Sequence, residues 1–197
     1  GVTLQELVSA YSAFANHGIK VESKGIRYVE NRNGKVLFKE SQNKTQPISN
    51  GIASVITSLL QSVVKEGTAK KVRALERPTA GKTGTTNNYI DAWFLGYTPK
   101  LLTGVWVGKD DVEPLGKNET GSRAALPIWL EYMKRALEGT PIHNFRTTYE
   151  TVFTKINPDT GNLTDAEDPK GYFEIFLKDK LPAKQNNATK VLIDKAF

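Results

Sequence analysis

The sequence contains no cysteine, and its 197 residues include no run of about 18 apolar side chains. Without cysteine, the chain cannot form disulfides, zinc–thiolate sites or a cysteine nucleophile. Without a long apolar run, no segment is predicted to span a membrane. A signal peptide is also missing, and the chain opens at Gly1 with a pattern typical of the middle of a domain. We therefore expect a piece of a longer protein.

Basic residues outnumber acidic residues only modestly. The chain has 27 Lys and Arg against 21 Asp and Glu, a formal net charge of +6, and the basic residues are scattered rather than gathered into a stripe. We therefore expect no nucleic-acid partner. With 39% hydrophobic and 24% charged residues, the composition is that of an ordinary globular domain, long enough to bury a core.

One short segment, residues 81–86 with the sequence GKTGTT, concentrates side chains suited to chemistry. On a strand, side chains alternate between faces, so Thr83 and Thr85 share one face. Lys82 and Gly84 lie on the other, and Gly84, which has no Cβ, lets a ligand or a second backbone approach closely. A lysine beside hydroxyls and backbone N–H groups suits an anionic ligand or a developing oxyanion.

The sequence after this segment extends the pattern. Residues 90–97, IDAWFLGY, and residues 101–108, LLTGVWVG, are apolar and aromatic strand candidates separated by a turn at residues 98–100. Such runs predict successive antiparallel strands. We expect three antiparallel strands within residues 78–108.

The stretch AGKTGTTNNYIDAWFLGYTPKLLTGVWVGKD resembles the third active-site motif and the next two strands of penicillin-binding protein transpeptidase domains. The segments DAWF and TGVWVG most resemble the class A, bifunctional members of that family. The likeness is strong over residues 1–140 and loose beyond them. It implies an α+β fold, an antiparallel sheet flanked by helices as in serine β-lactamases, of which this chain forms a part.

The resemblance also implies a reaction, which is acyl transfer through a serine ester. The serine attacks a D-Ala-D-Ala stem peptide of peptidoglycan, a second stem peptide takes the acyl group, and β-lactam antibiotics trap the ester. Lys82 would supply positive charge beside the nucleophile, and the Thr83 and Thr85 hydroxyls would hold the substrate carboxylate. The Thr85 N–H would be one oxyanion donor, and Gly84 would keep the strand edge clear for an extended peptide facing the substrate cleft.

The nucleophile is not found in this pattern. Ser41 to Lys44 formally matches S-x-x-K, but its surroundings are polar and unpatterned, whereas the family's serine opens a buried helix. Ser49-Asn50 weakly echoes the Ser-x-Asn motif, and helix capping explains it better. We expect both motifs upstream of Gly1, followed further upstream by a glycosyltransferase domain and a membrane anchor.

The expected partners and location follow from that resemblance. They are peptidoglycan stem peptides, β-lactams and the upstream part of the same protein, at the extracytoplasmic (periplasmic) face of the bacterial cytoplasmic membrane. No cofactor and no metal are implied. Loss of the upstream helix would expose the apolar stripe Ile52–Val64 and leave a cavity beside Lys82, unless an upstream fragment stays bound.

Capping residues and apolar spacing predict helices over residues 3–17, 49–66 and 124–138, packed on the sheet. Thr3 and Glu6 match a capping box, Ser49 is an N-cap, Pro127 lies in a first turn, and Gly18 and Gly139 lie at helix ends. Asn33-Gly34 predicts a two-residue hairpin turn within residues 25–39. Residues 1–140 are assigned to the transpeptidase portion, and residues 141–197 to a weakly structured extension with a polar tail from Lys178.

Two other functions remain open. The chain could be a non-catalytic module that holds cell-wall peptides at the same strand edge. More remotely, it could belong to a β-lactamase or carboxypeptidase relative. An apolar helix opening with S-x-x-K immediately upstream would favour catalysis, and its absence would favour the binding module.

Overall fold

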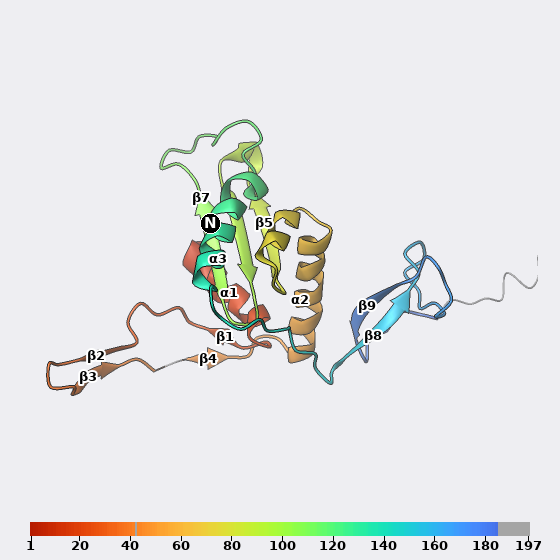
Figure 1. Ribbon diagram of the computed structural model, residues 1–197, viewed down its shortest axis with the longest axis horizontal. Helices are drawn as coiled ribbons and strands as arrows, with labels where there is room; N and C mark the ends of the chain where they lie inside the picture. Colours follow the sequence, from red (N-terminus) through yellow and green to blue (C-terminus); the bar gives the residue numbers. More distant parts are fainter. Residues whose placement is uncertain (42, 185–197) are drawn as a thin grey trace, which may run out of the picture. The chain divides into compact units, whose positions relative to one another are not determined.

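The computed structural model describes residues 1–41 and 43–184 (Figure 1). The chain divides into two compact units, the first spanning Gly1–Arg146 and the second beginning at Thr147, against an expected boundary near residue 140. The helices and strands of the first unit are α1 (Leu4–Ala15), β1 (Lys20–Val21), β2 (Tyr28–Glu30), β3 (Val36–Lys39), β4 (Lys44–Thr45), α2 (Asn50–Lys65), β5 (Ala80–Thr85), β6 (Ala92–Tyr97), β7 (Leu102–Val107) and α3 (Leu126–Ala136). Short 3-10 helices lie at Lys70–Leu75 and Asn87–Tyr89.

The three strands predicted within residues 78–108 are confirmed. They pair antiparallel in the order β5-β6-β7, so β5 and β7 are the edge strands of this sheet. Lys82 lies opposite Leu95, and Thr85 lies opposite Ala92. Short polar turns join the strands, which is why neighbours in the sequence are also neighbours in the sheet.

The two faces of the sheet are covered by different helices. On one face, Phe94 of β6 packs edge to face against Trp129 of α3, with ring centroids 5.0 Å apart, and both side chains are fully buried. On the other face, Leu4 and Val8 of α1 lie so close to Gly104 of β7 that a Cβ there would clash with them. The helix α2 runs beside β5 (Figure 1). The sheet is therefore buried through its centre, and β5 is left at its rim.

Helix α1 begins where its capping residues predict. Thr3 Oγ1 accepts the Glu6 N–H at 3.2 Å, and the Glu6 carboxylate accepts the Thr3 N–H at 2.8 Å, so the capping box of α1 is present. This helix ends two residues earlier than predicted, because His17 and Gly18 have positive φ angles of 56° and 92°. A left-handed residue cannot continue an α-helix.

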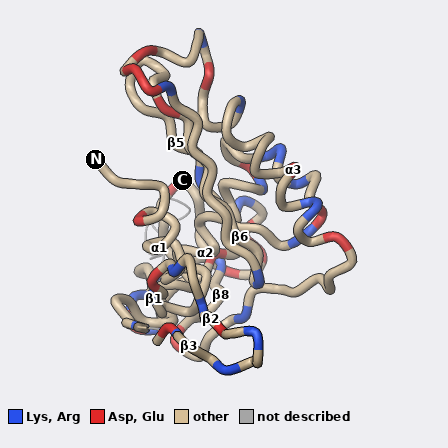
Figure 2. Tube along the Cα trace, turned by 90° about the vertical axis from the view of Figure 1, so that its left-hand side faces the viewer, with Lys and Arg blue, Asp and Glu red and all other residues tan. Residues whose placement is uncertain are grey.

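The helix α3 is shorter than the predicted range at both ends. A π-helical turn at Gly121–Ala125 precedes it, and Pro127 occupies its first turn as predicted. Its later turns carry Glu131, Lys134 and Arg135, and Arg135 pairs with Glu131 at 2.8 Å (Figure 2). Its apolar side faces the core through Trp129.

The predicted two-residue turn at Asn33-Gly34 is wrong. The strands β2 and β3 do form an antiparallel hairpin, but Asn31 and Lys35 close a three-residue loop, with the Asn31 N–H donating to the Lys35 carbonyl at 2.9 Å. The Asn31 side chain accepts the N–H groups of Asn33 and Lys35, both at 3.0 Å, which stabilises the longer loop. Gly34 takes its left-handed position, with φ of 76°.

The second unit holds more regular structure than we expected. Strands β8 (Thr151–Ile156) and β9 (Tyr172–Leu177) pair antiparallel over six residues each. In their connection, Asp168 accepts hydrogen bonds from the Asn157 side chain at 2.9 Å and the Thr164 hydroxyl at 2.7 Å. These bonds, together with the Lys170 N–H, lower the pKa of Asp168 to about 2. The predicted polar tail lies outside the described residues from residue 185 onward.

The apolar stripe Ile52–Val64 of α2 is exposed only in part, although we expected all of it to be exposed. Ile52 is 38% exposed and Leu59 is 52% exposed, whereas Val64 is buried. Val64 joins a core cluster with Val72 and Leu75 of the following 3-10 helix, which shields that end of the stripe. Two large apolar side chains therefore remain open to solvent on this helix.

We expect Ser49→Ala to lower the free energy of unfolding by about 1 kcal/mol, because Ser49 Oγ accepts the Ile52 N–H at 3.2 Å and caps α2. Denaturant unfolding of the purified protein measures the change. Ser49→Asp is the matched control, since an aspartate also accepts this bond and should preserve stability. Equal losses in both variants would show that the cap contributes little.

Candidate active site

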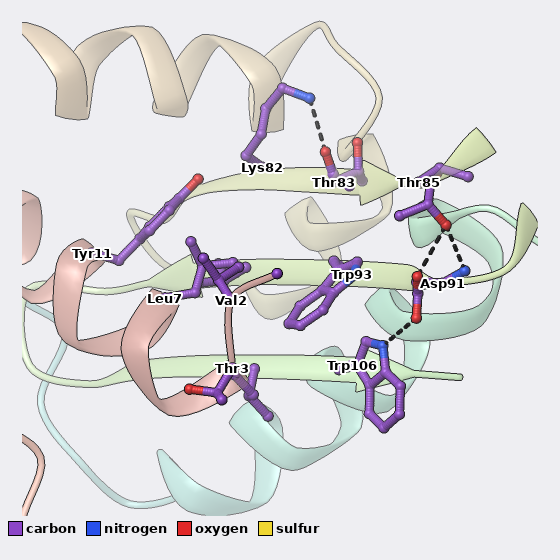
Figure 3. A pocket seen from close by; sticks show the side chains of 15 residues that line it. Val2, Thr3, Leu7, Tyr11, Lys82, Thr83, Thr85, Asp91, Trp93 and Trp106 are labelled. Atoms are coloured by element: carbon purple, nitrogen blue, oxygen red, sulfur yellow. Dashed lines mark hydrogen bonds between the residues drawn. The ribbon is translucent and has the colours of Figure 1, made fainter. Parts of the chain in front are cut away.

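A cavity of about 700 Å³ opens beside Lys82, as expected (Figure 3). Its polar rim is formed by residues 82–86 and by Asp91. Its apolar wall is formed by side chains from the start of the chain, from α1 and from the sheet, namely Val2, Leu4, Leu7, Tyr11, Trp93, Leu95 and Trp106. A cavity with a few convergent polar groups and an apolar wall is the usual form of a small-ligand or peptide site.

Lys82 is the cation of this rim. Its side chain is exposed on the edge strand β5, and its ammonium donates to the Thr83 carbonyl oxygen at 2.9 Å. Among the described residues, no Asp or Glu forms a salt bridge with it. The positive charge is therefore available to an anionic group that enters the cavity.

The two threonine hydroxyls of the motif already have partners in the chain. Thr83 Oγ1 lies 2.8 Å from the hydroxyl of Thr68, in the turn after α2. Thr85 Oγ1 accepts the Gly121 N–H at 3.1 Å. Because a hydroxyl has one donor and two acceptor lone pairs, Thr85 still has its O–H to give to a ligand.

The backbone N–H and C=O groups of Thr83 and Thr85 face away from β6. The Thr86 N–H donates to the Asp91 carbonyl at 3.1 Å, which continues the β5–β6 ladder by one pair. In an antiparallel ladder, hydrogen-bonded pairs alternate with pairs that do not exchange bonds. Thr85 and Thr83 therefore direct their N–H and C=O groups to the open edge of the sheet, away from β6.

Gly84 lies between the two threonines, and on its face of the sheet the Trp93 side chain packs closely against it. A Cβ placed there would come within 3.0 Å of the Trp93 Cβ. The space beside Gly84 on this face is thus taken by the Trp93 side chain of the neighbouring strand. The open edge of β5 is unaffected by this contact.

Two residues of the site carried no local sequence signal. Thr68 and Gly121 contact the motif from other parts of the chain. Their positions follow from the tertiary fold and from no spacing rule. Among the described residues, no group of three or more acidic or histidine side chains is arranged to hold a metal ion.

Neither of the two S-x-x-K matches lines the cavity. Ser41 is exposed and lies outside any helix, just before β4. A second match, Ser62 to Lys65, lies in the last turns of α2, where the Ser62 hydroxyl donates to the Ser58 carbonyl at 3.3 Å. None of these four end residues lines the cavity.

Residues 1–133 match the family of the penicillin-binding protein transpeptidase domain. The chain belongs to this family. Penicillin-binding protein 1A of Aquifex aeolicus is 39% identical over 181 residues, which are 92% of this chain and 25% of that protein. Penicillin-binding protein 1A of Pseudomonas aeruginosa is 34% identical, over 94% of this chain and 29% of that protein.

Solved structures of penicillin-binding proteins share the fold. Penicillin-binding protein 1A of Haemophilus influenzae matches with a TM-score of 0.85 and 27% identity, over 94% of this chain and 33% of that chain. PonA1 of Mycobacterium tuberculosis matches with a TM-score of 0.61 and 32% identity, over 73% of this chain and 40% of that chain. These neighbours confirm the α+β fold expected from the sequence.

The chain spans about a quarter of the length of the curated relatives it matches, 25% and 29% in the two cases above. The matched portion contains the Lys-Thr-Gly strand and the sheet, which fall within residues 1–133. None of the helices in residues 1–41 and 43–184 combines the length and apolar character that a bilayer crossing requires.

Proposed function

We propose that this chain forms the Lys-Thr-Gly wall of a serine D,D-transpeptidase that cross-links peptidoglycan. One observation carries the proposal: the exposed Lys82 and the outward-facing backbone of β5 border the same cavity. An extended stem peptide can add to that open edge as a further strand, and its carboxylate can meet the lysine and the hydroxyls. Membership of the penicillin-binding family supports this reading.

The chemistry assigned to the site is acyl transfer in two steps. A serine hydroxyl adds to the carbonyl of the penultimate D-alanine, the terminal D-alanine leaves as the amine with the proton, and an acyl-serine ester remains. The amine of a second stem peptide then attacks the ester, which releases the serine with its proton restored. Each step passes through an oxyanion, and a preorganised N–H donor that stabilises it is worth roughly 3 kcal/mol.

Each residue of the wall receives a role in this scheme. Lys82 supplies positive charge beside the nucleophile and the substrate carboxylate. The hydroxyls of Thr83 and Thr85 donate to that carboxylate, and the outward Thr85 N–H is an oxyanion donor. Gly84 keeps a side chain out of the tight space against β6, so the strand stays straight beside the substrate.

We infer that the nucleophile comes from a segment preceding Gly1 in the full-length protein. The relatives are about four times as long as the matched region, which leaves room for that segment, for a glycosyltransferase domain and for a membrane anchor. Such an anchor would place the domain at the extracytoplasmic face of the cytoplasmic membrane. β-Lactams, which mimic the donor peptide, are the expected inhibitors.

The test is covalent labelling of the full-length protein by a fluorescent penicillin. The transpeptidase reading predicts a stable adduct that survives denaturation and is prevented by prior treatment with an unlabelled β-lactam. A non-catalytic module that holds cell-wall peptides at the same strand edge would bind stem peptides reversibly and form no adduct. Absence of covalent labelling in a correctly folded protein would therefore favour the binding module.

We expect the adduct to lie outside this chain. Digestion of the labelled protein and mass spectrometry should place the β-lactam on a peptide that precedes Gly1, because neither Ser41 nor Ser62 lines the cavity. Ser41→Ala and Ser62→Ala should accordingly be labelled at the wild-type rate. An adduct on either serine would overturn the assignment of the nucleophile.

A further inference from the structure

The loop that follows the Lys-Thr-Gly strand has an unfavourable backbone. It joins β5 to β6 in a few residues, and two of them in succession, Asn88 and Tyr89, have positive φ angles of 59° and 57°. Side chains with a Cβ avoid this left-handed region, because the Cβ approaches the following carbonyl oxygen. Two such residues in a row persist only where the surrounding structure holds them.

Asp91 holds this loop closed at its base. The Thr86 hydroxyl donates to Asp91 Oδ2 at 3.1 Å and accepts the Asp91 N–H at 2.8 Å. The Thr86 N–H donates to the Asp91 carbonyl at 3.1 Å. Three hydrogen bonds therefore join these two residues, and they form the last pair of the β5–β6 ladder directly beyond Thr85.

The second oxygen of Asp91 bonds to a side chain of β7 that also lines the cavity. Asp91 Oδ1 accepts the indole N–H of Trp106, on β7, at 2.8 Å (Figure 3). Trp106 is 43% exposed and lies with its ring 6.0 Å from that of Trp93, so the two rings form one end of the cavity wall. A single carboxylate thus links the end of β5 to an aromatic wall carried by β7.

We propose that Asp91 is a positioning residue for the acylation step, a proposal that rests on the function proposed above. It acts through Thr86 on the neighbouring Thr85, whose outward N–H must point at the developing oxyanion. It acts through Trp106 on the cavity wall against which the acyl group lies. Asp91 itself contacts neither reacting atom, and its role is to fix the direction of groups that do.

The alternative is a purely structural role, in which Asp91 only stabilises a surface loop. In that case its removal lowers the unfolding temperature but leaves the bound substrate correctly placed in the protein that remains folded. A positioning role predicts that the substitution changes the acylation rate constant much more than the binding of the β-lactam. The rate constant for acylation falls in the folded protein, while the dissociation constant of the initial, noncovalent complex with the β-lactam changes little.

The experiment measures both constants by stopped-flow labelling of the full-length protein with a fluorescent penicillin. We expect Asp91→Ala to lower the acylation rate constant about 10- to 100-fold, because small misplacements of catalytic groups cost up to that much. Thr86→Val, which removes the hydroxyl but keeps the shape of the side chain, should lower the same constant. Glu131→Ala is the matched control, since it removes a carboxylate that pairs with Arg135 on the exposed side of α3.

The conservative variant Asp91→Asn separates hydrogen bonding from charge. Its amide oxygen can still accept the Trp106 indole N–H, and its amide nitrogen can donate to the Thr86 hydroxyl oxygen. We expect it to retain most of the acylation rate and the shifted indole N–H resonance of Trp106 in an NMR spectrum. The alanine variant should lose both.

Wild-type acylation rate constants in folded Asp91→Ala and Thr86→Val proteins would overturn the proposal, as would an Asp91→Asn variant as slow as Asp91→Ala. Should Asp91→Ala fail to fold, Thr86→Val and Asp91→Asn decide the matter by the same measurements. Failure of the wild-type protein to be labelled at all is a separate result. It would refute the proposed function, and the positioning role with it.

Discussion

Replacing Lys82 with alanine is expected to slow acylation by penicillin about 100- to 1000-fold while the fold stays intact, the loss typical of removing one preorganised electrostatic group. Lys82 is exposed on an edge strand, and its ammonium bonds to the Thr83 carbonyl rather than to the core. Its removal should therefore leave packing unchanged and take away the positive charge on the rim of the cavity. Labelling kinetics and circular dichroism of the full-length variant measure the two effects.

A matched control lies in the same sheet. Lys100 is an exposed lysine in the turn between β6 and β7, and it does not line the cavity beside Lys82. Lys100→Ala should be acylated at the wild-type rate. A Lys82→Ala protein that is folded and labelled as fast as Lys100→Ala would remove the proposed role of Lys82.

Gly121→Ala is expected to disrupt both stability and acylation. A Cβ at this position would come within 2.3 Å of the Trp93 carbonyl oxygen and 2.5 Å of the Gly84 carbonyl oxygen. Both atoms belong to the backbone of the β5–β6 ladder, so neither can move aside without bending the Lys-Thr-Gly strand. Overpacking of this kind costs about 1–3 kcal/mol and occasionally more, and we expect the upper part of that range.

The same substitution also disturbs the bond from the Gly121 N–H to the Thr85 hydroxyl. Thermal unfolding and penicillin labelling of the full-length variant should show a lower midpoint and slower acylation together. Gly25→Ala is the control, because a Cβ at Gly25 meets no atom within 4 Å. A Gly121→Ala protein that behaves like Gly25→Ala would mean that the turn before α3 yields freely and does not support β5.

The parts of the fold that the sequence predicts well are those fixed by local interactions. The capping box at Thr3 and the N-cap at Ser49 act within one helical turn, so the helix starts follow from a few neighbouring residues. The three strands follow from apolar runs separated by short turns. The β2–β3 turn was mistaken because the Asn31 side chain, outside the Asn-Gly pair, selects the longer loop.

The residues of the candidate site also fall into those that the sequence predicts and those that only the fold reveals. Lys82, Thr83, Gly84 and Thr85 were found because they lie on one strand within a recognisable motif. Thr68 and Gly121 reach the motif only through the tertiary fold, across 15 and 36 positions of the sequence. Asp91 lies within the resembling stretch, but its link to Trp106 depends on the register of β6 against β7, which the sequence pattern does not give.

A crystal structure of the full-length protein acylated by a β-lactam tests the central claim most directly. The account predicts an ester to a serine that precedes Gly1, with the β-lactam lying along the open edge of β5. Its carboxylate should lie about 3 Å from the Thr83 or Thr85 hydroxyl, and its ester carbonyl oxygen about 3 Å from the Thr85 nitrogen. An acylated serine whose β-lactam makes no contact with residues 82–85 would contradict the account.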